Sequence, residues 1–210
     1  MGTADGDAFD DYRGMVIDPS GRFGEGVRRL PHMFFGVRPE DSLFPTRVLE
    51  LVLSEALHLQ HRPPSPGPHE RSVAVEIHDD LTFTVAHDEP SAVEPPTNSD
   101  FPMLLGPVWW GYEAAFAFAI RTRVEVWETG AGLRYDFNGF DAAEPPAAFE
   151  APPGGGTRVT YALDPANLSP SATLPRDPAT LEPHCGPHCA DAPSPAAFAF
   201  VDHRPLHRPQ

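Results

Sequence analysis

Residues 75–88 read V-E-I-H-D-D-L-T-F-T-V-A-H-D, and this stretch decides the interpretation of the fold. Apolar and polar residues alternate on both sides of the polar residues 78–80, with Val75 before them and Phe83 and Val85 after them. A period of two is typical of a strand with one buried face, and a short polar group between two such runs is typical of a turn. The stretch therefore predicts a β-hairpin.

Further elements are predicted on either side of this hairpin. Upstream, Leu49, Val52, Leu53 and Ala56 have the spacing of one helix face, which predicts a helix over residues 43–60. Helices alternating with antiparallel strands predict an α+β fold, a two-layer sandwich with helices on one face of a mostly antiparallel sheet. The other expected elements are a helix at 112–122, strands at 123–128 and 133–137 that form a hairpin around 129–132, and strands at 157–162 and 197–201.

The composition restricts the classes of function. The 210 residues, 40% of them hydrophobic, suit one domain with a buried core, and no run of about 18 apolar residues offers a membrane span. A net charge of −15 argues against binding to nucleic-acid phosphates, which requires clustered cations. All 15 basic residues are Arg, so chemistry based on a Lys ammonium is excluded. The acidic start lacks a signal-peptide pattern, and we expect a cytoplasmic protein.

Changes in composition mark the expected boundaries. Residues 1–21 predict a flexible acidic arm, residues 22–204 one domain and residues 205–210 a tail. Within the domain, residues 141–156 are rich in Ala, Pro and Gly and predict a spacer, whereas residues 163–195 are dense in Pro and predict an irregular stretch.

That irregular stretch contains four metal-capable side chains, His184, Cys185, His188 and Cys189. Structural zinc sites usually combine two separated pairs of ligands. Six contiguous residues interrupted by Gly-Pro do not favour tetrahedral coordination by all four, so we predict no metal site.

A resemblance to a known family runs through the chain in order. Residues 26–36, G-V-R-R-L-P-H-M-F-F-G, are similar to the V-R-K-R-P-G-M-Y-I-G segment that opens the ATPase domain of gyrase B, a component of DNA gyrase. Residues 43–59 resemble the family helix that carries E-V-V-D-N, and residues 75–88 match without gaps the hairpin before its D-N-G-R-G loop. Residues 106–111 stand where the family has G-L-H-G-V-G. The resemblance covers roughly residues 22–204 and implies the Bergerat ATP-binding sandwich of the GHKL superfamily, without counterparts of the transducer and DNA-cleavage domains.

The resemblance implies a hydrolytic site on the first of these helices. The family Glu that activates water for attack on the γ-phosphate falls on Glu50. Four residues later the family Asn that ligates Mg²⁺ is replaced by Ser54, whose hydroxyl is a weaker ligand. A shifted register pairs residues 54–57, S-E-A-L, with the family's D-E-A-L, and it still supplies no Asn. The family implies ATP and Mg²⁺ as ligands, whereas this helix argues against the metal.

The adenine end of the family site is changed as well. The family Asp that accepts a hydrogen bond from the adenine amine falls on His87 in the gap-free match, and a shift by one residue brings in Asp88 instead. The Thr that supports adenine is retained as Thr157, in a stretch that resembles the family's T-G-T-x-V strand. The glycines of the G-R-G loop become E-P-S at residues 89–91, which restricts the backbone and adds negative charge.

The phosphate loop keeps its outer glycines and loses the inner one. Gly106 and Gly111 match the family, but Trp109 stands where the family has Gly. An indole at this position would fill a cradle of backbone donors. The segment before Gly106 is also too short for the family's long, glycine-rich ATP lid.

Two functions from different classes remain open. The combined loss of the Mg²⁺ ligand, the adenine Asp, the glycines and the lid favours a pseudo-ATPase that acts as a binding or regulatory module. The alternative is a divergent but functional ATPase of the type II topoisomerase kind, with Glu50 as general base and Arg in place of Lys. A kinase-like or chaperone-like relative is less favoured, because residues 26–36 are gyrase-like. We expect a protein partner, no direct contact with DNA or membranes, and a monomer, because the arm through which gyrase B dimerises is short and acidic here.

Overall fold

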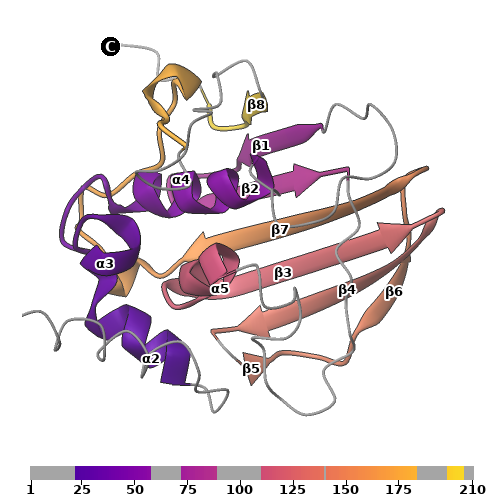
Figure 1. Cartoon of the computed structure of the whole chain (residues 1–210), viewed down its shortest axis with the longest axis horizontal. Coiled ribbons are helices and arrows are strands. Elements are labelled where there is room, and N and C mark those ends of the chain that lie inside the picture. The colour runs from indigo at the N-terminus through magenta and orange to yellow at the C-terminus, as the bar shows by residue number, and fades with distance from the viewer. Residues whose placement is uncertain (1–21, 58–71, 89–109, 140, 184–197, 206–210) are drawn as a thin grey trace, which may run out of the picture.

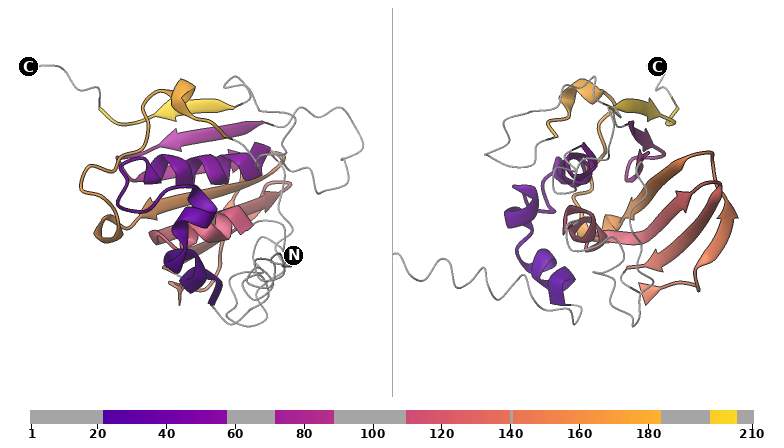
Figure 2. Two further views of the ribbon diagram at one scale, coloured as in Figure 1. Left: turned by 60° about the vertical axis from the view of Figure 1, so that its left-hand side comes forward. Right: turned by 45° about the vertical axis from the view of Figure 1, so that its right-hand side comes forward.

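The computed structural model describes residues 22–57, 72–88, 110–139, 141–183 and 198–205. These residues form one sheet with α-helices packed on one of its two faces (Figure 1). The right-hand view of Figure 2 separates the two layers, with the helices on one side and the strands on the other. This arrangement confirms the predicted α+β sandwich. The predicted arm at 1–21 and most of the tail lie outside the described residues.

The sheet is mixed but mostly antiparallel. Its strand order is β5-β4-β3-β7-β2-β1-β8, with β6 paired to β4. The described neighbours are antiparallel except β1 and β8, which are parallel. The strands are β1 Val73–Ile77, β2 Thr82–His87, β3 Ala119–Glu128, β4 Ala131–Asn138, β5 Asp141–Ala142, β6 Ala147–Glu150, β7 Gly155–Leu163 and β8 Ala199–Asp202.

Both predicted hairpins are confirmed. Between β1 and β2, the N–H of His78 donates to the carbonyl of Thr82 at 2.9 Å, and the Asp79 carboxylate accepts from the N–H of Leu81 at 2.8 Å. Between β3 and β4, Thr129 and Gly130 have φ of 52° and 82°. Two successive positive φ values are typical of the two-residue turn whose twist matches that of the flanking strands.

The helices cover the inner face of the sheet. They are α2 Arg22–Arg29, α3 Pro31–Phe35, α4 Phe44–Leu57 and α5 Trp110–Phe116. The inner face of α4 is apolar and includes Phe44, Val48, Leu49, Val52, Leu53 and Ala56, all buried. Burial of each large apolar side chain of this kind contributes about 1.5–3 kcal/mol. No helix among the described residues is long and apolar enough to cross a membrane.

An aromatic cluster joins three segments of the helical layer. The ring of Phe44 at the start of α4 lies with its centroid 5.0 Å from that of Phe35 and 4.7 Å from that of Phe118. Phe35 and Phe118 are 5.6 Å apart, and all three pairs meet edge to face. This geometry contributes beyond simple burial, and it fixes the start of α4 against the turn between α5 and β3.

Two predicted segments differ from the structure. The predicted helix at 112–122 was too long, because α5 ends at Phe116 and β3 begins at Ala119. Ala119 pairs with Leu163, so sheet pairing across the chain overrides the local Ala/Phe composition. The stretch at 141–156, expected as a spacer, contains β5 and β6, and β6 carries Phe149 over Gly132.

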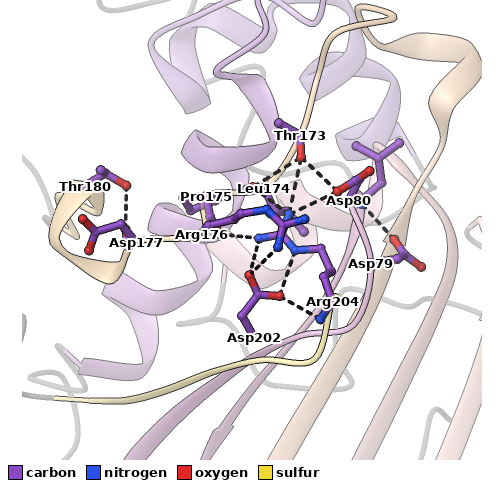
Figure 3. Close-up of polar contacts among 11 residues, drawn as sticks. Asp79, Asp80, Thr173, Leu174, Pro175, Arg176, Asp177, Thr180, Asp202 and Arg204 are labelled. Atoms are coloured by element: carbon purple, nitrogen blue, oxygen red, sulfur yellow. Dashed lines mark hydrogen bonds and ion pairs between the residues drawn. The ribbon is translucent and has the colours of Figure 1, made fainter. Parts of the chain in front are cut away.

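A buried arginine fastens the last strand to the rest of the sheet (Figure 3). Arg204, 7% exposed, donates through Nε and Nη2 to the two carboxylate oxygens of Asp202 at 2.9 and 2.8 Å. Its guanidinium also donates to the carbonyls of Leu174 and Pro175 at 3.0 and 2.8 Å and lies 3.3 Å from an oxygen of Asp80. One cation therefore joins β8, the β1–β2 turn and the segment after β7.

Candidate nucleotide site

The residues expected at a nucleotide site come from α4, α5 and the adjoining ends of β2 and β7. α4 lies across the inner face of the sheet over β1 and β2 (Figure 1). β2 and β7 pair so that His87, the last residue of β2, lies opposite Thr157. The structure therefore places Glu50 and Ser54 of α4 and the pair of His87 and Thr157 on one side of the sheet.

Both oxygens of the Glu50 carboxylate accept hydrogen bonds from other residues of the chain. Glu50 is 5% exposed, and its Oε2 accepts from Arg47 Nη1 at 2.7 Å, one turn earlier in α4. Its Oε1 accepts from the backbone N–H of Glu182 at 2.7 Å. Arg47 also lies 3.8 Å from the Glu182 carboxylate. Both oxygens of Glu50 thus fix the segment around Glu182 to α4.

Ser54 continues the same stripe of α4. Its hydroxyl is buried and donates to the carbonyl of Glu50 at 2.6 Å. This bond to the preceding turn is the usual arrangement of a serine inside a helix. The hydroxyl proton is therefore used within the helix. The family Asn, by contrast, would direct its amide oxygen at Mg²⁺.

The two residues predicted for the adenine position, His87 and Asp88, lie in different environments. His87 is 3% exposed and lies on the inner face with Val85, whereas Asp88 follows the end of β2 and is exposed. The Asp88 carboxylate accepts from the N–H of Ser72 at 3.1 Å and so closes the open end of the hairpin. Of the two candidates, His87 is therefore the one that faces the core, opposite the buried Thr157, and its role toward adenine stays a prediction.

Gly111 allows α5 to lie directly against α4. A Cβ at Gly111 would lie only 2.6 Å from Cγ of Glu55, so glycine is needed for this close approach. The Gly111 N–H donates to the Glu55 carboxylate. A backbone donor of the first turn of α5 is thus used by a side chain of the protein itself.

A second carboxyl group lies close to Glu55. Burial raises the pKa of Glu55 to about 7, although the bond from Gly111 partly offsets this. Burial, and after it the charge of Glu55, raises the pKa of Glu113 to about 8. The neighbouring Tyr112 carbonyl accepts from the buried Tyr161 hydroxyl at 2.9 Å. This end of the site is apolar and, once ionised, negatively charged, which disfavours phosphate oxygens.

These arrangements do not fit Mg-ATP. The carboxylate expected as general base is used by Arg47 and Glu182, and the hydroxyl expected near Mg²⁺ is bonded within its helix. The Gly111 amide, at the end of the predicted phosphate loop, is bonded to Glu55. Of the other expected positions, Gly106, Trp109 and the lid lie outside the described residues.

A cavity of about 230 Å³ lies elsewhere, on the outer face of the sheet. Its lining includes Arg123, Asp136 and Thr160, which alternate with residues that face the helices. Arg123 and Asp136 form an ion pair at 2.8 Å within it. Because α4 covers the opposite face, this cavity is separate from the candidate nucleotide site.

Comparison with known proteins gives matches at the level of structure. No protein-family model and no curated protein matches the sequence. A crystal structure of the 43K ATPase domain of Thermus thermophilus gyrase B, in complex with an aminocoumarin, aligns with a TM-score of 0.55 and 22% identity over 74% of this chain. The fold is that of a gyrase B ATPase domain. The B-subunit of the DNA gyrase from Myxococcus xanthus aligns with a TM-score of 0.54 and 19% identity over 76% of the chain.

The match confirms the resemblance to gyrase B for the fold alone. The chain spans 42% and 47% of the two gyrase structures, which is less than half of either. Identities of 22% and 19% leave the activity of this chain open, so its function must be argued from its own side chains.

Sequence reasoning missed several side chains that the structure brings together. Glu55 was assigned no role of its own beyond its place in S-E-A-L. Its contact with Gly111 joins α4 to α5, which no local sequence pattern connects. The role of Glu182 as a donor to Glu50 was not predicted, because the two residues are 132 positions apart. The Arg204 network likewise depends on contacts between distant segments.

Proposed function

We propose that this chain is a pseudo-ATPase: a gyrase-B-type domain that has lost ATP hydrolysis and acts as a binding or regulatory module. The observation that carries the proposal is the use of both Glu50 oxygens within the protein, by Arg47 and by the backbone N–H of Glu182. A general base must reach the proton that it removes, directly or through one water. A buried carboxylate with two charge-assisted or amide donors is instead a structural anchor.

The Glu55–Gly111 contact supports the same proposal. Helix N-termini bind phosphate through backbone N–H groups. Here the Gly111 N–H is bonded to a carboxylate of α4, and a second carboxyl, Glu113, lies near it. Nucleotide phosphates would have to displace the Glu55 carboxylate and approach a second carboxyl group, that of Glu113. Positioning of phosphate charge supplies most of the catalysis of phosphoryl transfer.

Two measurements test this proposal. We expect calorimetric titration with Mg²⁺ and a non-hydrolysable ATP analogue to give no saturable heat, and steady-state assays to give no turnover above background. Glu50→Gln tests the candidate base, and Glu128→Gln, at an exposed end of β3, is the matched control. Turnover in the wild-type chain that is lost in Glu50→Gln and kept in Glu128→Gln would refute the proposal and establish the enzyme.

One observation favours the alternative of a functional ATP-binding domain. The buried residues His87 and Thr157 lie opposite each other, and both are polar residues that the resemblance assigns to adenine binding. If these residues bind adenine, calorimetry with an adenine nucleotide gives a saturable heat that is lost in His87→Ala. Binding of this kind would contradict the expected absence of a saturable heat, and without turnover it would leave only the loss of hydrolysis standing.

We further propose a basic protein as the partner of this module. The chain carries a net charge of −15, and acidic surfaces accelerate association with basic ones. Such an interaction weakens with rising salt, which a pull-down at two ionic strengths measures. We expect the isolated chain to be a monomer in analytical ultracentrifugation.

A further inference from the structure

The outer face of the sheet carries two histidines and a glutamate on neighbouring strands. Val75 and Ile77 of β1 point to the core, so Glu76 and His78 point to the outer face. β8 runs parallel to β1, with Ile77 opposite Asp202, and His203 follows directly. The parallel register thus brings residues 127 positions apart, Glu76 and His203, to one spot.

The three side chains lie within the reach of one ion. One ring nitrogen of each histidine and a carboxylate oxygen of Glu76 lie within 4.8 Å of one another. Nε2 of His203 is 3.0 Å from Oε2 of Glu76. The rings of His78 and His203 are parallel, with an interplanar angle of 4° and centroids 5.4 Å apart. Imidazole nitrogens and a carboxylate are a donor set that Zn²⁺ and similar divalent transition metals prefer.

The backbone and one ring of this group are held in place by other residues. Asp202 and Arg204, on either side of His203, are bonded to each other, and the N–H of His203 donates to the carbonyl of Ile77 at 2.8 Å. Nε2 of His78 lies 2.8 Å from the hydroxyl of Thr84, which lies 2.8 Å from that of Thr160. Ligating histidines usually keep their other ring nitrogen for a hydrogen bond of this kind.

We propose that Glu76, His78 and His203 form a binding site for one divalent transition metal ion of the Zn²⁺ type. Metal–ligand bonds of about 2.0–2.2 Å require the donor atoms to approach by roughly 1 Å, which rotation of exposed side chains provides. Three protein ligands leave a fourth position for water. The site lies on the opposite face of the sheet from Glu50, so it does not depend on the proposed loss of ATP hydrolysis.

Binding of Zn²⁺ would fasten β8 to β1 from the outer face. Metal that binds only the folded chain raises its melting temperature. The prediction from the sequence alone was that the chain has no metal site, and this group escaped notice because its third member is distant in sequence.

The test uses the full chain without a polyhistidine tag and titrates it with ZnSO₄ by calorimetry, with Co²⁺ absorption as a second readout. We expect one saturable site, lost in His203→Gln and in His78→Gln. Thr84→Val removes the hydroxyl that bonds to His78 and to Thr160 but leaves all three proposed ligands in place, and we expect it to weaken the affinity by about 10–100-fold. Circular dichroism checks that each variant is folded.

Two control variants make the result decisive. His32→Gln changes an exposed histidine in α3, and Cys185→Ser with Cys189→Ser removes the other metal-capable group. Both controls should keep the wild-type affinity. Unchanged affinity in His203→Gln, or loss of the site in the cysteine variant, would overturn the proposal.

Discussion

The carboxyl pair of Glu55 and Glu113 makes stability depend on pH in an unusual direction. Their pKa values in the folded chain are about 7 and about 8, against an ordinary value of 4.5. Between these limits the folded state binds more protons than the unfolded state, so the free energy of unfolding falls as pH rises. The contribution of the two protonated carboxyl groups to the stability of the folded chain is complete below about pH 4.5. It is lost as pH rises through about 8.

The size of the stability loss follows from the two pKa shifts. Each pKa unit corresponds to about 1.4 kcal/mol, so the two shifts would give about 3 and about 5 kcal/mol if the groups titrated separately. The charge of Glu55 raises the pKa of Glu113, so the two contributions are coupled and do not add. We expect the free energy of unfolding to fall by on the order of 4 kcal/mol between pH 5 and pH 9.

Urea denaturation at 25 °C across this pH range measures the effect. Glu113→Gln removes the group with the higher pKa and keeps its shape, so we expect this variant to be more stable than wild type at pH 9 and less sensitive to pH. Glu128→Gln, an exposed residue, should follow wild type. A wild-type stability that rises steadily from pH 5 to pH 9, or a Glu113→Gln variant that is less stable at pH 9, would refute the reasoning.

Three further predictions concern single contacts. Gly111→Ala places a Cβ 2.6 Å from Cγ of Glu55, and we expect a loss of about 1–3 kcal/mol in urea denaturation. Tyr161→Phe removes the donor to the Tyr112 carbonyl and should cost about 1–3 kcal/mol, measured in the same way. The Arg204 guanidinium lowers the pKa of Asp202 to about 2, so its contribution is complete above about pH 4 and is lost as pH falls towards 2. Asp202→Asn should therefore lower the melting temperature at pH 7, and the difference from wild type should shrink below pH 4.

The sequence predicted the elements whose pattern is local. The alternation around Phe83 and the helical spacing from Leu49 to Ala56 identified β1, β2 and α4, and their order along the chain indicated the fold. The end of α5 was wrong, because Ala119 is placed by its pairing with Leu163 and not by its neighbours. β5 and β6 were not predicted, because these short strands lie in an Ala- and Pro-rich stretch that lacks alternation of apolar and polar residues.

In the candidate site, too, local spacing could be predicted and contacts between distant segments could not. The spacing of Glu50 and Ser54 placed both on one stripe of α4. The sequence left His87 and Asp88 as alternatives, and the pairing of β2 with β7 is needed to show that His87 is the one opposite Thr157. What the Glu50 carboxylate bonds to could not be predicted, because its donor belongs to a segment without periodicity near Glu182.

The parallel pairing of β8 with β1 also bears on how the chain is made. Until β8 arrives, β1 has an unpaired edge, and such an edge is a template for pairing with another chain. The residues that meet there, Glu76 and His203, are 127 positions apart, which a ribosome working at roughly 5–20 residues per second covers in roughly 6–25 s. During that interval the outer edge of β1 lacks its partner, and β8 covers it only after the ribosome has made residues 199–202.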